Sequence, residues 1–300
     1  MYQVITFYHF VRFQDLVSLQ RSLRETCRNE RTKGTILLAH EGINGTIGGS
    51  ESGVTRVLEE IRTFPGCQNV SWRTSWSSRL PFNRMKVRLK QEIVSMGRPN
   101  GELSMRTGHY VASVDWNEFC HDPDTVMIDT RNHYEVTIGT FVGAINPKIK
   151  SFREFPEWWE NQGHLFMDKK IAMFCTGGIR CEKSTHYLVQ RGIEDVYHLK
   201  GGILKYLEDV PKEDSLWQGS GFVFDDRVSV DYGLIEGPHI LCHGCRAPLS
   251  PEDTKRPEYE PGVSCHHCIS ETSDDDKERF RERQKQITLA RARGQTHLGD

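Results

Sequence analysis

The stretch KIAMFCTGGIRCEKSTHYLVQ, residues 170–190, decides the fold of the middle of the chain. It begins with a compact apolar run, KIAMFC, of the kind that a parallel strand covered on both faces shows. It ends with RCEKSTHYLVQ, which has a helical pattern. The residues between these runs are too few and too rich in glycine for anything except a tight loop. A strand that turns sharply into a helix predicts an α/β unit.

Cys175 stands at the end of this strand, where open α/β sheets bind their ligands. In such a loop, successive backbone N–H groups point into a hollow, and the positive end of the next helix dipole lies beneath it. Both favour a thiolate, and Arg180 adds a fixed positive charge. We therefore predict that Cys175 is an activated nucleophile with Arg180 beside it, rather than a buried cysteine that only fills the core. The rest of the loop comprises Thr176, Gly177, Gly178 and Ile179.

Further strands and helices surround this unit and predict one α/β domain with a parallel sheet over residues 108–215. TVMIDTR (125–131) is a second buried strand, and SFREFPEWWENQ (151–162) is helical. Asp129 and Arg131 stand at the end of the second strand. The polar stretch 95–108, with glycine and proline, is expected to be a linker.

The N-terminal residues 1–95 alternate between strand and helix patterns in the order βαββαβ, with one further closing strand. The strand-like runs are 3–10, 35–40, 69–76 and 85–94, and the helical ones are 15–29 and 52–64. GINGTIGG (42–49) is expected to be a glycine-rich turn with a short strand. This order predicts a ferredoxin-like α+β domain.

The closing strand of this domain carries a row of cations. Alternate residues of a strand share a face, and the row comprises Arg84, Lys86, Arg88 and Lys90. Such a row is either an ordinary solvated face or a set of phosphate contacts, with Trp72 or Trp76 nearby to stack on a base. The residues alone leave both interpretations open.

Four cysteines form two CxxC pairs near the C-terminus, with nineteen residues between the pairs. Two knuckles of this spacing converge on a tetrahedral ion, and four thiolates suit structural zinc. The predicted ligands are Cys242, Cys245, Cys265 and Cys268. Two redox-active pairs are the alternative. We expect residues 216–270 to form a strand (222–230) plus this zinc module. Residues 271–300 form a charged tail, expected to be a solvated helix or disordered rather than an RNA-binding arm.

The composition excludes several classes of protein. The 300 residues have a formal net charge of −2, which gives no global attraction to nucleic acid or membrane. The sequence has no run of eighteen apolar residues, and its N-terminus lacks the basic start and apolar core of a secretory signal. We expect a cytoplasmic protein without membrane contact, in which cysteines serve catalysis and metal binding.

The loop CTGGIR (175–180) is similar to the six-residue active-site loop of the rhodanese family, whose first residue is the nucleophilic cysteine. DTRN (129–132) resembles the Asp-x-Arg strand end of the same family, and this resemblance implies that Asp129 and Arg131 support the loop structurally rather than react. Phosphatases of a related fold place five residues between cysteine and arginine, whereas this chain has four. A shorter loop has a smaller hollow, which suits a sulfur adduct better than a phosphate.

A wider resemblance extends over about residues 2–270, to the rhodanese-domain tRNA uridine hydroxylases. It is carried by LLAHEGINGTIGG (37–49), KVRLKQEIVSMG (86–97), IDTRNHYEVTIGTFVGAINP (128–147), FCTGGIRCEKS (174–184) and VYHLKGGILKYLE (196–208). The resemblance implies oxygen-dependent conversion of the wobble uridine of certain tRNAs to 5-hydroxyuridine. It implies dioxygen as co-substrate, the tRNA anticodon loop as partner and Cys175 as the essential cysteine, and it leaves the electron donor unknown.

With this resemblance, we expect the cation row to bind tRNA and the target uridine to leave its stack to reach Cys175. The amides of GINGTIGG are further candidates for phosphate contact. A cysteine that we expect from the family ahead of FVFD is replaced by Gly221, so a resolving thiol at that position is doubtful. Cys181 is either an auxiliary thiol or part of the helix packing. Two other functions compete with hydroxylation. The first is a sulfurtransferase that carries a persulfide on Cys175. The second is an RNA-binding adaptor, and the intact CTGGIR loop argues against the adaptor.

Overall fold

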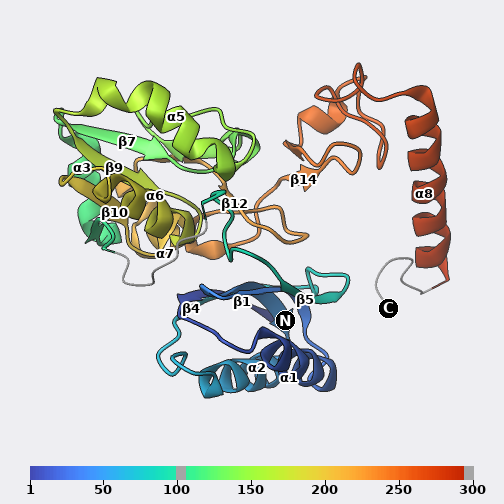
Figure 1. Ribbon diagram of the computed structural model, residues 1–300. Helices are drawn as coiled ribbons and strands as arrows, with labels where there is room; N and C mark the ends of the chain where they lie inside the picture. Colours follow the sequence, from blue (N-terminus) through green and yellow to red (C-terminus); the bar gives the residue numbers. More distant parts are fainter. Residues whose placement is uncertain (99–105, 294–300) are drawn as a thin grey trace.

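The computed structural model describes residues 1–98 and 106–293. It contains an N-terminal α+β part, a central α/β part and a C-terminal module that ends in a long helix (Figure 1). Residues 99–105 of the expected linker and 294–300 of the expected tail lie outside the described residues. None of the helices in the described part of the chain combines the length and apolarity that a bilayer crossing requires.

The N-terminal part is a five-stranded sheet with two helices on one face (Figure 1). The strand order is β4-β1-β3-β2-β5, in which β5 runs parallel to β2 and the other neighbours are antiparallel. Its elements are β1 (Tyr2–Phe10), α1 (Leu16–Asn29), β2 (Lys33–Ala39), β3 (Gly42–Gly49), α2 (Glu51–Thr63), β4 (Trp72–Ser77) and β5 (Met85–Leu89). The prediction of a ferredoxin-like fold with an added strand is confirmed.

Local sequence explains where these helices begin and what they bury. The carboxylate of Asp15 accepts the Ser18 N–H at 3.0 Å and caps α1. Ser50 caps α2 in the same way through the N–H of Gly53, at 3.1 Å. Both helices pack on Ile5 and Phe7 and other residues of the helix-covered face, so the opposite face of the sheet remains free for the central domain.

The segment GINGTIGG differs from its expectation, because it forms the eight-residue strand β3 in the middle of the sheet. Its backbone pairs with β1 on one side and β2 on the other. The expectation that its amides are available to RNA phosphate is therefore wrong. Glycine is needed at position 45, since a Cβ there would lie 2.8 Å from the Phe7 ring.

The central part is a parallel sheet in the order β6-β10-β9-β7, with helices on both faces (Figure 1). In β9, Ile171 and Met173 pack in one core, and Ala172 and Phe174 pack in the other. This alternation explains the unbroken apolar run of the strand. The elements are β6 (His109–Val111), α3 (Trp116–His121), β7 (Thr125–Asp129), α4 (His133–Val136), β8 (Gly139–Phe141), α5 (Phe155–Gln162), β9 (Lys170–Phe174), α6 (Ile179–Val189), β10 (Val196–Leu199) and α7 (Gly202–Asp209). The predicted parallel α/β fold is confirmed.

The C-terminal residues form short strand pairs and a final helix. The strand expected at 222–230 is instead two short strands, which pair antiparallel across a turn. The turn forms because Arg227 donates to both carboxylate oxygens of Asp225 and Val228 takes a positive φ of 65°. The elements are β11 (Trp217–Gly219), β12 (Gly221–Phe222), β13 (Ser229–Val230), β14 (Ile240–Leu241), β15 (Pro248–Leu249) and α8 (Asp274–Ala292). Helix α8 is largely exposed, and Arg281 ties it to Glu260.

The free face of the N-terminal sheet lies against the end of the central sheet that carries the cysteine loop. Arg73 of β4 donates to the carbonyl oxygen of Gly201 at 3.2 Å. The Ser75 hydroxyl accepts from Arg227 at 2.8 Å. The cysteine loop therefore lies at the junction of the two domains.

Candidate active site

The cysteine loop joins β9 directly to α6. Cys175 follows the last residue of β9, and its sulfur accepts the Gly178 N–H at 3.1 Å. Gly178 has a φ of 99°, in the left-handed region that favours glycine, and it immediately precedes α6. The predicted strand, tight loop and helix are all present, and an amide faces the sulfur as expected.

Helix α7 holds the loop from the other side. The N–H groups of Ile203 and Leu204 donate to the carbonyl oxygens of Cys175 and Thr176, at 2.9 and 3.1 Å. A Cβ at position 202 would lie only 2.4 Å from the Cys175 carbonyl oxygen, so this approach requires Gly202. These bonds turn the loop carbonyls away from the hollow that faces the sulfur.

Cys175 is fully buried and its thiol is acidified. Burial acts to raise the pKa of Cys175, but a hydrogen bond from the Cys181 thiol, the charge of Arg180 and two backbone N–H groups lower it to about 6. Burial and the neighbouring Cys175 raise the pKa of Cys181 well above its usual range. Near neutral pH, the pair therefore consists of a Cys175 thiolate that accepts a hydrogen bond from the Cys181 thiol. Cys181 also packs in the core beneath the loop.

Arg180 is held by a carboxylate that the sequence analysis missed. Its two terminal nitrogens donate to Glu135 at 2.7 and 2.6 Å in a bidentate pair. Both side chains are buried, and the pair holds the pKa of Arg180 above its usual range despite the burial that lowers it. Glu135 also accepts the Asn132 N–H at the start of α4, a capping box that the sequence N-H-Y-E signals. That signal predicts where a helix begins, but it does not predict that Glu135 also binds Arg180.

Asp129 and Arg131 lie beneath the loop and point away from the sulfur. Arg131 donates to both oxygens of Asp129 at 2.8 and 2.6 Å, and also to the carbonyl oxygens of Glu135 and Gly139. The pair is fully buried. The pair thereby connects the end of β7 to α4, and α4 carries Glu135, the partner of Arg180. This geometry suits the expected supporting role.

A cavity of about 460 Å³ lies at the domain junction and reaches the loop at Gly177. Its wall includes the side chain of Glu182, whose carboxylate accepts hydrogen bonds from Tyr8 and Tyr110. A Cβ at Gly177 would meet no atom within 4 Å, so the loop is open on this side. The sequence analysis did not select these three residues. For Glu182 the signal is the polar run CEKSTH in a helix that has to pack on a sheet, and Tyr8 and Tyr110 give no such signal.

The structure separates the cation row from the tryptophans. Lys86 and Arg88 lie on the outer strand β5 and Arg84 directly precedes it, whereas Trp72 and Trp76 lie on β4 at the opposite edge of the sheet. The two groups therefore do not form one patch, and Trp72 packs instead beneath the Arg62 guanidinium. Burial and the neighbouring Arg84, Arg88 and Arg246 lower the pKa of Lys86, which shows that positive charge accumulates on this edge. Lys90 follows β5 and is exposed.

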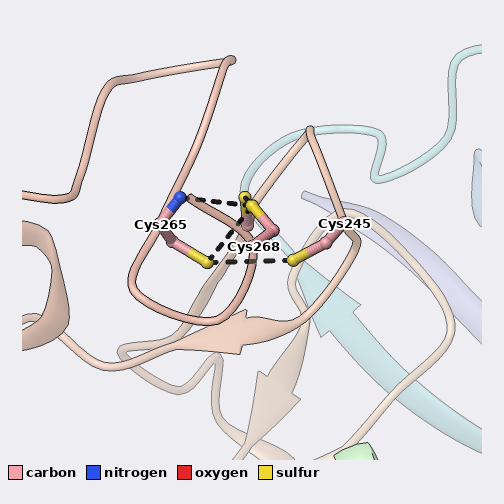
Figure 2. A group of neighbouring side chains, drawn as sticks. Cys245, Cys265 and Cys268 are labelled. Atoms are coloured by element: carbon pink, nitrogen blue, oxygen red, sulfur yellow. Dashed lines mark hydrogen bonds between the residues drawn. The ribbon is translucent and has the colours of Figure 1, made fainter. Parts of the chain in front are cut away.

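The four C-terminal cysteines come together as predicted. All four sulfur atoms lie within 4.8 Å of one another, and three of the pairs are separated by 3.7 to 4.0 Å. Figure 2 shows Cys245, Cys265 and Cys268 pointing toward one point. Zinc–sulfur bonds of about 2.3 Å in a tetrahedron place sulfur atoms about 3.8 Å apart, so the cluster fits a four-thiolate metal site.

A parallel sheet with a cysteine-led loop at its carboxyl end, followed by an arginine at the start of a helix, defines a rhodanese-like domain. The profile of the rhodanese-like domain matches residues 115–209, and that of the UPF0176 acylphosphatase like domain matches residues 2–93.

Relatives similar over the whole chain carry one name. A tRNA uridine(34) hydroxylase of Roseobacter denitrificans is 57% identical over 98% of this chain and 99% of its own. The proteins of the same name from Ruegeria pomeroyi and Jannaschia sp. are 61% and 54% identical, over 99% and 100% of this chain and 99% of each relative. The chain belongs to the tRNA uridine(34) hydroxylase family.

Proposed function

We propose that this protein hydroxylates uridine 34 of tRNA at C5, with Cys175 as the nucleophile. The observation that carries the proposal is a buried, acidified thiol under a cavity at the domain junction. The family's name supplies the tRNA substrate, and the cavity at the junction, which reaches the loop at Gly177, offers room for one base. Replacing the C5–H of uracil by C5–OH with dioxygen consumes two electrons and two protons and releases one water, so the enzyme is of the monooxygenase type and needs a reductant.

The residues around Cys175 have different roles in the proposed reaction. The Gly178 N–H and the Cys181 thiol stabilise negative charge on Cys175, and Arg180 adds its charge from its fixed position on Glu135. Cys181 acts as the auxiliary thiol of the pair, since it carries the proton next to the nucleophile. Thr176, Gly177 and Ile179 shape the loop.

The basic edge of the N-terminal sheet supports a contact with the tRNA backbone. Arg88 on β5 and Arg84 directly before it are exposed, and Lys86 lies between them. This row suits phosphate groups, whereas the target base enters the junction. A tRNA substrate places the enzyme in the cytoplasm.

The cysteine cluster suits one structural zinc ion. Four thiolates fill a tetrahedral site and leave no position for a substrate, so the metal holds the module of residues 216–270 together. We assign residues 1–95 and 108–215 to the two folded domains in front of it and residues 271–300 to the charged tail.

The alternative of sulfur transfer at Cys175 has no support from the relatives, which carry the hydroxylase name. Nucleoside mass analysis of anticodon loops from cells that lack this protein separates the functions. The hydroxylase proposal predicts loss of 5-hydroxyuridine with thiolation unchanged. Loss of a thiolated nucleoside instead would favour the sulfurtransferase, and no change would favour the adaptor.

A further inference from the structure

The carboxylate of Glu182 is held across the domain junction by two tyrosines. Tyr8, from β1 of the N-terminal sheet, donates to Glu182 Oε1 at 3.0 Å. Tyr110, from β6 of the central sheet, donates to Oε1 at 3.0 Å and to Oε2 at 2.8 Å. Glu182 lies in the first turn of α6, close behind the cysteine loop. A single carboxylate therefore joins both domains and the loop.

This carboxylate differs from the other buried acids of the junction. Glu135 is paired with Arg180, and Glu92 with Lys183, but in the described part of the chain Glu182 is bound by hydroxyl groups and by no cation. Glu182 is 7% exposed, so its burial is costly without a partner. A carboxylate accepts about four hydrogen bonds, and the two tyrosine hydroxyls supply two protons, of which that of Tyr110 is shared between both oxygens. At least one acceptor position therefore remains on Oε2.

The cavity beside Glu182 has the size and lining of a nucleobase site. Its volume of about 460 Å³ lies within the roughly 300–1,000 Å³ usual for small ligands. Tyr8, Phe10 and Tyr110 are among its lining residues, and the rings of Tyr8 and Phe10 meet edge to face. RNA-binding proteins stack unpaired bases on such rings. Lys200 lies exposed on the same wall and offers a charge to a phosphate group.

We infer that Glu182 binds the N3–H edge of the flipped-out uracil and thereby selects uracil against cytosine, while Tyr8 and Tyr110 position its carboxylate. Uracil presents a donor at N3, which the remaining lone pair of Oε2 accepts. Cytosine presents a lone pair at the same atom, which the carboxylate repels. A site that hydrogen-bonds one substrate rejects a mismatched one because its buried polar group is left unpaired. This inference rests on the proposed function, since it takes the nucleotide at position 34 as the ligand.

The test measures binding of a fluorescent anticodon stem-loop to the full-length, metal-loaded protein. Three RNAs are compared, with uridine, 3-methyluridine or cytidine at position 34. The wild-type protein is expected to bind the uridine RNA roughly 10-fold more tightly than either of the others. In Glu182→Gln, the amide can turn to donate or accept, so the three affinities are expected to lie within about 2-fold of one another.

Three further variants guard against loss of folding. Glu160→Gln changes a carboxylate that also accepts from a tyrosine, Tyr187 at 2.9 Å, but lies outside the cavity, and it should keep the wild-type preference. Gly177→Leu directs a side chain into open space without a positive φ, so the fold tolerates it. It should weaken binding of the uridine RNA, and Gly177→Ala should weaken it less.

The outcomes separate this inference from the proposed function, because 5-hydroxyuridine is measured in the same samples with dioxygen and a reductant. If the wild type forms 5-hydroxyuridine but binds the uridine and cytidine RNAs equally, the inference is overturned and the proposed function stands. A preference for uridine that survives in Glu182→Gln would also overturn it. A wild-type preference that Glu182→Gln abolishes, without any 5-hydroxyuridine, would support the inference and overturn the function.

Discussion

Lys183 of α6 donates to Glu92 of the N-terminal part at 2.7 Å, with both side chains buried. The same ammonium lies 2.8 Å from Glu41, so one cation binds two carboxylates across the domain junction. Because α6 begins at the cysteine loop, this contact fixes the loop relative to the N-terminal sheet. The candidate site thus depends on the docking of both domains.

Replacing Lys183 by Met should destabilise the protein strongly, because two buried carboxylates lose their common cation. Breaking a buried pair from one side costs about 3–5 kcal/mol. Urea unfolding measures the change. Lys205→Met, which removes surface pairs with Glu208 and Asp209, is the matched control and should have little effect. Equal midpoints for the two variants would show that the junction does not depend on this contact.

The contribution of Glu92 should also depend on pH. Burial acts to raise its pKa, but the hydrogen bond from Lys183, the Met96 and Gly97 N–H groups and the charge of Lys183 lower the pKa below its ordinary 4.5. A carboxyl whose folded pKa is depressed stabilises the fold fully above its unfolded pKa. The stability difference between wild type and Lys183→Met should therefore be largest near neutral pH, where the variant buries two unpaired carboxylates, and should shrink as the pH falls below 4.5. A difference that grows on acidification would contradict this ion pair.

The thiolate of Cys175 should appear at unusually low pH. Thiolate absorbance near 240 nm, taken as wild type minus Cys175→Ser, should rise with a midpoint near the pKa of about 6. The absorbance of the four C-terminal cysteines cancels in this difference. A midpoint near the ordinary thiol value of 9.0 would mean that the amide, the Cys181 thiol and Arg180 do not stabilise the anion.

Charge reversal on β5 should weaken tRNA binding. Arg84→Glu combined with Arg88→Glu replaces two exposed cations by anions, and we expect at least about 10-fold weaker binding at physiological salt, with a shallower salt dependence. Arg56→Glu is the control, because Arg56 lies on α2, which covers one face of the sheet and is not part of the basic edge. If both variants bind tRNA as the wild type does, the basic edge does not touch RNA.

Purified protein should contain one zinc ion per chain, held by the four cysteines. Cys245→Ser should lose the metal and make the module of residues 216–270 sensitive to protease, whereas Cys67→Ser should retain the metal. Metal analysis and limited proteolysis check this. Metal-free protein that forms two disulfides on mild oxidation would instead support the redox interpretation of the pairs.

The patterns along the chain predicted those features that depend on local spacing. The strand, glycine loop and helix around Cys175 and the convergence of the four cysteines follow from such spacing. The prediction of a turn in GINGTIGG was wrong because pairing with β1 and β2 keeps these glycines extended against their local preference. The Phe7 ring fills the space above Gly45, which a larger residue would need. Glu135 and Glu182 were not predicted because their partners come from other elements. Such pairings arise only when the domains dock.

The most direct test of the account is 5-hydroxyuridine formation on an anticodon stem-loop by Cys175→Ser and Cys67→Ser, with dioxygen and reductant present. Cys67 is buried in the N-terminal core, far from the loop in the fold, so it controls for loss of a buried thiol. We predict that Cys67→Ser forms the product and that Cys175→Ser forms none while still binding the RNA. Unchanged 5-hydroxyuridine from Cys175→Ser would contradict the central claim that this sulfur performs the chemistry.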